Sequence, residues 1–102
     1  MTLQKAVETY LAPCYRWKRN FSVIFRGRDS VYAADLDTAL RQAVLLSYLQ
    51  LRKTGRFFPV YVKDNKACRI ICRLENREKI LELAEEFFDL QLKDKEQVSL
   101  VG

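Results

Sequence analysis

Apolar residues at every second position mark the strands of this chain, and this alternation limits the possible folds more than any other feature. Residues 21–25 carry apolar side chains at alternate positions, which predicts a strand. A turn is predicted over residues 27–30 and a short returning strand over 31–34. Residues 57–63 and 67–74 show the same alternation and predict a second hairpin.

The register of this second hairpin follows from the side chains that share a face. Val60 and Val62 lie on the apolar face of its first strand, and Cys68 and Ile70 lie on that of its second. A two-residue loop mixes the two faces, whereas a three-residue loop over Asp64–Lys66 pairs Val62 with Cys68 and Val60 with Ile70. A one-residue slip moves every side chain to the opposite face, so we predict the three-residue loop.

Three helices are predicted, each beginning after a residue type that caps helices. They span residues 3–12 after Thr2, residues 36–53 after Asp35 or Asp37, and the segment from Asn76 to about Leu90. Pro13 ends the first helix, and Gly55 suits the C-terminal end of the second.

The long central helix is apolar around most of its circumference. Its apolar residues are Leu36, Leu40, Val44, Tyr48 and Leu51 on one side and Leu45, Leu46 and Leu49 on others. A helix of this kind is either buried on several sides or shared with another subunit.

These elements predict a single α+β domain over all 102 residues. We expect an antiparallel sheet of about four strands, with two helices packed on one face in the order β(β)αββα(β), plus a short N-terminal helix. The expected parts are an N-terminal helix in 1–13, a basic aromatic connector in 14–20, a core in 21–92 and a tail in 93–102. The segment from Phe21 is faintly echoed by that from Phe58, but the spacing differs by four residues along the two copies.

The chain lacks the residues and motifs of most common active sites. It has no histidine, no zinc-binding spacing among its three cysteines, and no glycine-rich phosphate loop. We therefore predict no catalytic residue, no metal and no cofactor, and we interpret Cys68 and Cys72 as buried free thiols. Asp35 and Asp37 are better explained as helix caps than as a catalytic pair.

No segment of the sequence resembles a membrane span. The longest unbroken apolar run covers residues 57–62, whereas a spanning helix needs about 20 residues. Lys5 and Glu8 interrupt any signal-peptide core at the N-terminus. The sequence therefore predicts a cytoplasmic protein that does not enter the membrane.

Charge is unevenly distributed along the chain. Residues 1–70 contain 13 Lys or Arg and 5 Asp or Glu, whereas residues 71–102 contain 5 and 8. One basic and one acidic face are expected. The first candidate surface mixes cations with aromatic rings, which suits phosphates and unpaired bases, unless its tryptophan folds into the core. Its residues are Tyr15, Arg16, Trp17, Lys18, Arg19, Arg26 and Arg28.

The second candidate surface is the outer face of the second hairpin. If Val60 and Val62 point inward, their neighbours point outward and offer two aromatic rings among several cations. The predicted residues are Phe57, Tyr61, Lys63, Arg69 and Arg73. The chemistry is that of a base-stacking sheet, although no RNP1-type string is present. The alternative is that another helix covers this face.

The third candidate surface is acidic and follows the last helix. Its residues recur at helical spacing, and they are Glu75, Glu78, Glu82, Glu85 and Asp89. A solvated helix face is the simplest interpretation, and a docking site for a basic partner is the alternative.

These features favour a small non-catalytic protein–protein interaction or regulatory module. Its partner is another protein or a second copy of the chain, which would associate through the long apolar helix. The alternative is a nucleic-acid-binding domain that uses the basic and aromatic residues. A small enzyme of unknown class is a second alternative.

Overall fold

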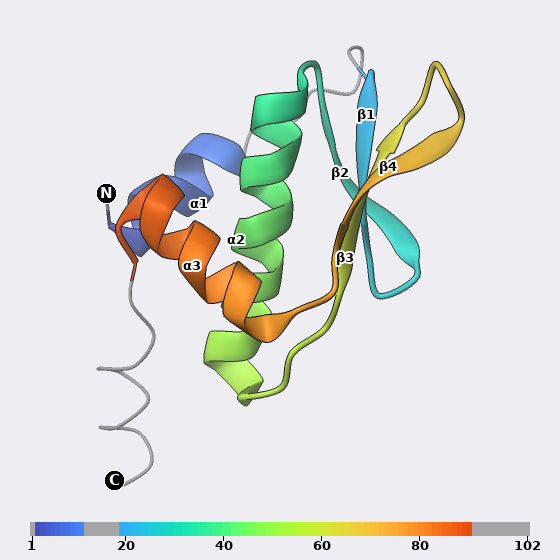
Figure 1. The fold of residues 1–102 in the computed structure, drawn as a ribbon. Helices are drawn as coiled ribbons and strands as arrows, with labels where there is room; N and C mark the ends of the chain where they lie inside the picture. The colour runs from blue at the N-terminus through green and yellow to red at the C-terminus, as the bar shows by residue number, and fades with distance from the viewer. Residues whose placement is uncertain (1, 12–18, 91–102) are drawn as a thin grey trace, which may run out of the picture.

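The computed structural model describes residues 2–11 and 19–90 of the chain (Figure 1). Three helices and four strands follow one another in an α+β order. They are α1 (Leu3–Tyr10), β1 (Phe21–Phe25), β2 (Arg28–Ala33), α2 (Leu36–Thr54), β3 (Val60–Asp64), β4 (Arg69–Leu74) and α3 (Arg77–Phe88). The predicted fold class is therefore confirmed, while the tail in 93–102 lies outside the described residues.

The four strands form one antiparallel sheet in the order β2-β1-β3-β4. Helix α2 lies along one face of the sheet and contacts β1, β2 and β3. Helices α1 and α3 pack against α2 on the side away from the sheet, so all three helices lie on the same side (Figure 1). The opposite face of the sheet is left without a helix among the described residues.

The predicted helix caps are confirmed in the structure. The side chains of Thr2, Asp35 and Asn76 each accept a hydrogen bond from the backbone N–H three residues later. Helix α2 ends at Gly55, whose φ of 75° places it in the left-handed region that favours glycine. Asp37 forms an ion pair with Arg41 at 2.9 Å one turn later. Both aspartates at the start of α2 therefore serve the helix itself.

The chain is built from two successive strand–strand–helix units. Strands β1 and β3, the first of each unit, pair with Val23 opposite Val62 at the centre and with Phe21 opposite Asp64 and Phe25 opposite Val60 on either side. This pairing is symmetric about its centre, so Phe21 corresponds to Val60. The sequence echo, which matches Phe21 with Phe58, is shifted by two residues from this correspondence.

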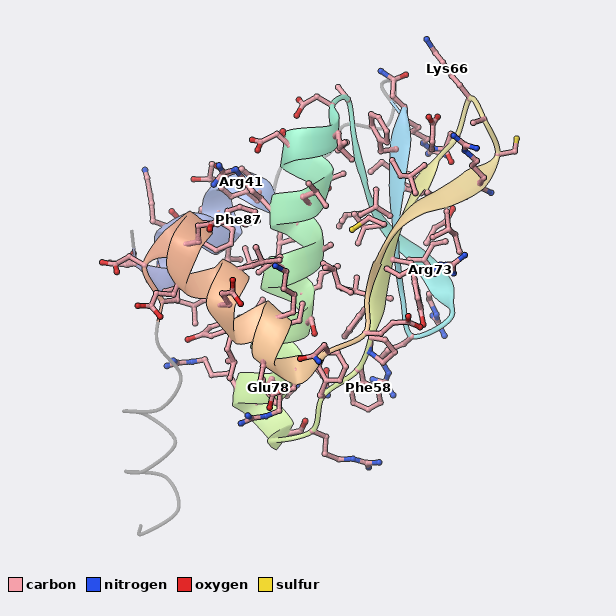
Figure 2. The ribbon with its side chains drawn as sticks, in the orientation of Figure 1. Arg41, Phe58, Lys66, Arg73, Glu78 and Phe87 are labelled. Carbon is pink, nitrogen blue, oxygen red and sulfur yellow. The ribbon has the colours of Figure 1, made fainter. Side chains whose placement is uncertain are left out.

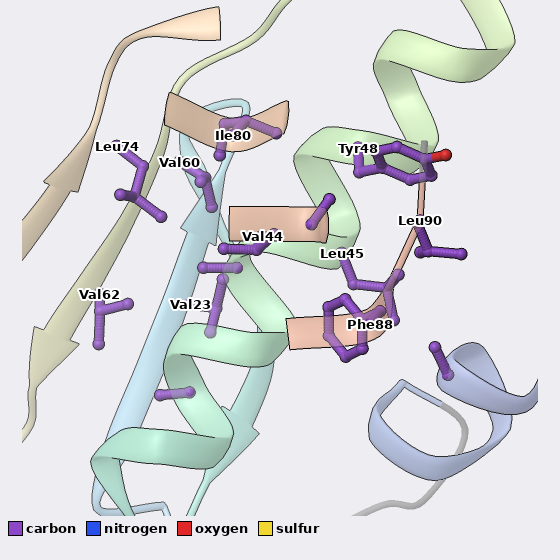
Figure 3. Packing of buried hydrophobic residues seen from close by; sticks show 14 of the residues in the cluster. Val23, Val44, Leu45, Tyr48, Val60, Val62, Leu74, Ile80, Phe88 and Leu90 are labelled. Carbon is purple, nitrogen blue, oxygen red and sulfur yellow. The ribbon is translucent and has the colours of Figure 1, made fainter. Parts of the chain in front are cut away.

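The core lies between α2 and the sheet and continues between α2 and the other helices (Figure 3). Leu45, Val44 and Tyr48 of α2 are all 0 % exposed, and Phe88 of α3 packs beside Leu45. The apolar helix is thus buried on several sides. Leu45 is inside the protein, so it offers no surface to a second subunit.

Polar side chains on α2 fix its position between the layers. The amide nitrogen of Gln42 donates to the carbonyl of Tyr10 at 3.0 Å and to that of Tyr32 at 3.2 Å. On the outer side, the guanidinium of Arg41 lies 4.7 Å from the ring centre of Phe87 in α3 (Figure 2). The helix is therefore tied to α1, to β2 and to α3 at once.

The turn between β1 and β2 is tighter than predicted. Phe25 pairs with Arg28, so two residues, Arg26 and Gly27, connect the strands. Both have positive φ, 56° and 83°, as type I′ hairpin turns require. Strand β2 consequently begins at Arg28, and a bulge opposite Val23 and Ile24 absorbs the extra residue.

The predicted register of the second hairpin is wrong. Val62 pairs with Cys72 and Val60 with Leu74, four residues beyond the predicted partners. The carboxylate of Asp64 accepts hydrogen bonds from the backbone N–H groups of Lys66 and Ala67, and this local bonding stabilises a longer turn.

The longer turn also changes the environment of the two cysteines in this hairpin. Cys68 has a φ of 54° within the turn and is exposed, contrary to the prediction of a buried thiol. Cys72 is half-buried on the same side of the sheet as Val62, with which it pairs, and burial raises the pKa of its thiol above the ordinary value. Both thiols are free.

Candidate functional site

The open face of the sheet is the side opposite α2, and its side chains form two rows across the four strands. The first row is Tyr32, Ser22, Lys63 and Ile70, and the second is Asp29, Ile24, Tyr61 and Arg73. In Figure 2, Arg73 projects from the sheet away from the helices. Most of these side chains are at least partly accessible, although Ser22 is buried.

The sheet layer carries most of the positive charge of the described chain. Residues 19–34 and 56–75 contain eight Lys or Arg and three Asp or Glu, a net charge of +5. The helices and their caps in 2–11, 35–54 and 76–90 contain six and eight, a net charge of −2. The open face therefore belongs to a basic layer backed by an acidic one, which favours an anionic ligand on the sheet side.

Tyr61 lies at the centre of the second row, between Ile24 and Arg73. Its hydroxyl donates a hydrogen bond to the carboxylate of Glu75 at 3.0 Å. This hydrogen bond is the main reason why the pKa of Tyr61 is raised above its ordinary value. Tyr61 is therefore a neutral phenol at physiological pH, and its ring offers an apolar surface between Ile24 and the guanidinium of Arg73.

Asn65 holds the second hairpin against the beginning of β1. Its side chain exchanges hydrogen bonds with the hydroxyl of Ser22 and donates to the carbonyl of Arg19 at 2.7 Å. The guanidinium of Arg19 in turn lies 4.5 Å from the ring centre of Tyr32. One edge of the first row is thus organised around a cation resting on an aromatic ring.

The structure changes the membership of the predicted outer sheet face. Tyr61, Lys63 and Arg73 share the open face, as predicted. Phe57 precedes β3 and packs against the core. Arg69 pairs with Asp64, whose position in β3 belongs to the inward side of the sheet. Arg69 is therefore on the inward side as well, because the bulge at Ile71 reverses the alternation in β4.

Sequence reasoning missed three members of the open face. Ile24, Tyr32 and Ile70 join it only through pairing across the four strands. The signal for Ile24 was present in the alternation of β1. For Tyr32 and Ile70 the bulges decide the face, and no local pattern locates a bulge.

The predicted basic surface is divided by the structure. Tyr15, Arg16, Trp17 and Lys18 lie outside the described residues. Arg19 precedes β1, whereas Arg26 and Arg28 lie at its other end, roughly 20 Å away at the rise of an extended strand. Arg19 therefore belongs with Tyr32, and the two hairpin arginines belong to a different part of the sheet.

The acidic residues of the last helix are all exposed, and they are Glu75, Glu78, Glu82, Glu85 and Asp89. Glu78 lies in the first turn of α3 on the helix side of the molecule (Figure 2). Glu82 has Lys79 at 3.9 Å one turn earlier, and Asp89 caps the helix with a φ of 57°. Glu75 differs from the others, because its contact with Tyr61 places it beside the open face.

Two further observations concern the described residues alone. Within 2–11 and 19–90, no three His, Cys, Asp or Glu side chains are grouped so that they could hold a metal ion. None of the helices in these ranges has the length and apolar character required to cross a membrane.

Comparison of the chain with protein-family models, with curated proteins and with solved structures finds no match. The function is therefore inferred from the residues of this chain.

Proposed function

We propose that this protein is a non-catalytic module that binds single-stranded nucleic acid on the open face of its sheet. The observation that carries the proposal is the juxtaposition of Tyr61 and Tyr32 with Lys63, Arg73 and Arg19 on a face that none of the described helices covers. Aromatic rings stack on unpaired bases, and the cations between them neutralise the phosphates.

The shape of the face favours a single strand over a duplex. Tyr61 and Lys63 project from neighbouring positions of a broad sheet rather than from an exposed helix that would enter a groove. Bases that are free of a partner can spread over such a surface and stack on its rings. The acidic helix α3 lies on the far side of α2, where it does not repel the strand.

The test is the binding of a fluorescent single-stranded oligonucleotide, measured by anisotropy at increasing salt. Tyr61→Ala should lower the affinity roughly fivefold to a hundredfold, because stacking contributes about 1–3 kcal/mol per base. Tyr61→Phe keeps the ring and should bind like the wild type. Lys63→Gln should reduce the slope of log K against log salt by about 0.7, the value for one phosphate contact with a single strand.

Glu75 and Lys5 provide the controls. Glu75→Gln removes a carboxylate beside Tyr61 and should tighten binding. Lys5 is an exposed cation on α1, in the helix layer, so Lys5→Gln should change the affinity little. Absence of binding at low salt, or an equal loss from Lys5→Gln and Lys63→Gln, would contradict the proposal.

A second function is favoured by two exposed apolar side chains on the edge strand β4. Ile70 and Ile71 are 36 % and 38 % exposed, and the edge of β4 presents backbone groups that can pair with another strand. We propose as the alternative a protein partner at this edge, with a second copy of the chain as the simplest case.

One substitution distinguishes the two functions. Ile71→Lys places a charge in an apolar contact and should dissociate a dimer, while the added cation should not weaken nucleic-acid binding. Sedimentation of the wild type gives the discriminating mass, a multiple of 12.0 kDa for the alternative. A mass of one chain at high protein concentration would contradict self-association.

A further inference from the structure

Two arginines that are distant in the sequence lie against one aromatic ring at the end of the sheet. The guanidinium carbon of Arg26, in the β1–β2 turn, lies 5.0 Å from the ring centre of Phe58, and that of Arg56 lies 5.8 Å from it. Figure 2 shows Phe58 close to the segment that leads into β3. Both cations are therefore within reach of a ligand placed beside this ring.

The position of Phe58 is itself determined by the core. The hydroxyl of Ser47, which is fully buried in α2, donates to the carbonyl of Phe58 at 3.0 Å. The ring of Phe58 meets that of Phe25 edge to face, with 6.4 Å between the ring centres. The platform on which the arginines rest is thus held by a buried hydrogen bond and by an aromatic contact.

Arg26 occupies a backbone conformation that its residue type disfavours. Its φ is 56°, in a two-residue turn where Asn, Asp or Gly is the common choice at this position. Residues held in such conformations gather at binding sites, where the side chain is needed more than the local stability. The guanidinium of Arg26 is a reason for an arginine at this position despite the backbone cost.

The arginines of the turn border a hollow. It has a volume of about 460 Å³ and is lined by Phe25, Arg26, Arg28 and Ser30. Its volume falls in the range of small-ligand pockets, roughly 300–1,000 Å³. Within residues 2–11 and 19–90, no carboxylate forms an ion pair with Arg26 or Arg28, nor with Arg56. Their charge is consequently available to an anion.

We propose that Arg26, Arg28 and Arg56 bind a phosphate group of the strand that lies on the open face, a step that rests on the proposed function. A guanidinium donates two parallel hydrogen bonds to phosphate oxygens, and stacking on Phe58 limits the freedom that Arg26 and Arg56 lose on binding. The hollow lies at the hairpin end of the sheet, one pair beyond Ile24 and Asp29, where Phe25 and Arg28 on its wall have the parity of the α2 side. A strand whose bases stack on Tyr61 reaches this phosphate site by passing around the hairpin end of the sheet.

The test compares a triple variant, Arg26→Asn with Arg28→Gln and Arg56→Gln, with the wild type and with Lys5→Gln. The probe is the same fluorescent single-stranded oligonucleotide. The triple variant should lose at least tenfold in affinity at moderate salt, and its salt slope should fall by about 0.7, because the three arginines share one phosphate and one phosphate contact contributes about 0.7. Thermal unfolding of each variant verifies that it is folded.

The outcomes separate this inference from the proposed function. If the triple variant binds like the wild type while Tyr61→Ala does not, the phosphate site is refuted and the open face stands. If the wild type fails to bind the oligonucleotide, titration with inorganic phosphate decides, with the amide NMR signals of Arg26, Gly27 and Arg28 as the readout. Shifts in the wild type that are absent from the triple variant support the site, and their absence from the wild type refutes it.

Discussion

Replacing Arg26 in the β1–β2 turn separates the backbone strain of this residue from the contact that its side chain makes. Arg26 has a φ of 56° and is followed by Gly27 with a φ of 83°. Arg26→Asn and Arg26→Ala both remove the guanidinium from the ring of Phe58. They differ in the backbone, because asparagine tolerates the left-handed region and alanine does not.

The magnitude follows from two opposing contributions. The left-handed conformation costs a residue with an ordinary Cβ about 1–2 kcal/mol. The cation–π contact of Arg26 with Phe58, at 5.0 Å, contributes about 0.5–1 kcal/mol at an exposed site. Arg26→Ala should therefore lower the free energy of unfolding by about 0.5–1 kcal/mol. Arg26→Asn recovers most of the backbone cost and should be at least as stable as the wild type.

The assay is thermal unfolding of the three proteins, followed by circular dichroism under one set of conditions. The asparagine variant should unfold about 4–8 °C above the alanine variant, the shift that 1 kcal/mol produces in a domain of 60–100 residues. If the two variants unfold at the same temperature, Arg26 carries no backbone strain, and this support for the phosphate site is lost. A loss of oligonucleotide binding in the stable asparagine variant would show that the two properties are independent.

Three further predictions concern the core, the thiols and the open face. Leu45→Ala should lower the free energy of unfolding by about 2–5 kcal/mol in a urea titration, because Leu45 is 0 % exposed; a loss below about 1 kcal/mol would contradict its place in the core. Cys68 should react with a thiol reagent near neutral pH before Cys72, because burial shields Cys72 and raises the pKa of its thiol, which leaves less reactive thiolate; mass spectrometry of partly labelled protein identifies the order. Glu75→Gln should lower the pKa of Tyr61 toward its ordinary value, since the phenol then loses its charged acceptor; the ultraviolet absorbance of tyrosinate against pH measures the change, with Tyr61→Phe to assign it.

The elements of this fold were predictable because their signals are local. A cap residue and the N–H group from which it accepts a hydrogen bond are three positions apart. Thr2, Asp35 and Asn76 therefore predict where their helices begin from residues within one helical turn. The alternation in residues 21–25 likewise marks a strand without reference to its neighbours.

The candidate site was only partly predictable. Tyr61, Lys63 and Arg73 were assigned to one face because the alternation of their strands holds in that segment. Arg69 and Phe57 were assigned wrongly, since a bulge and a late strand start each break the alternation. Tyr32 and Ile70 were not found at all, because their place on the open face depends on strand pairing.

The sequence by itself determined the order of the elements, their approximate ends and the excess of positive charge in the strand segments, all of which depend on neighbouring residues. The tertiary structure alone decided the register of the second hairpin, the burial of α2 on several sides and the meeting of Arg26 with Arg56 on Phe58. Hydrogen bonds between strand backbones are the same at every register, so the turn hydrogen bonds of Asp64 and the packing of side chains from distant segments together select one. For the same reason, the residues proposed to hold a phosphate come together only when α2 positions Phe58 beside the β1–β2 turn.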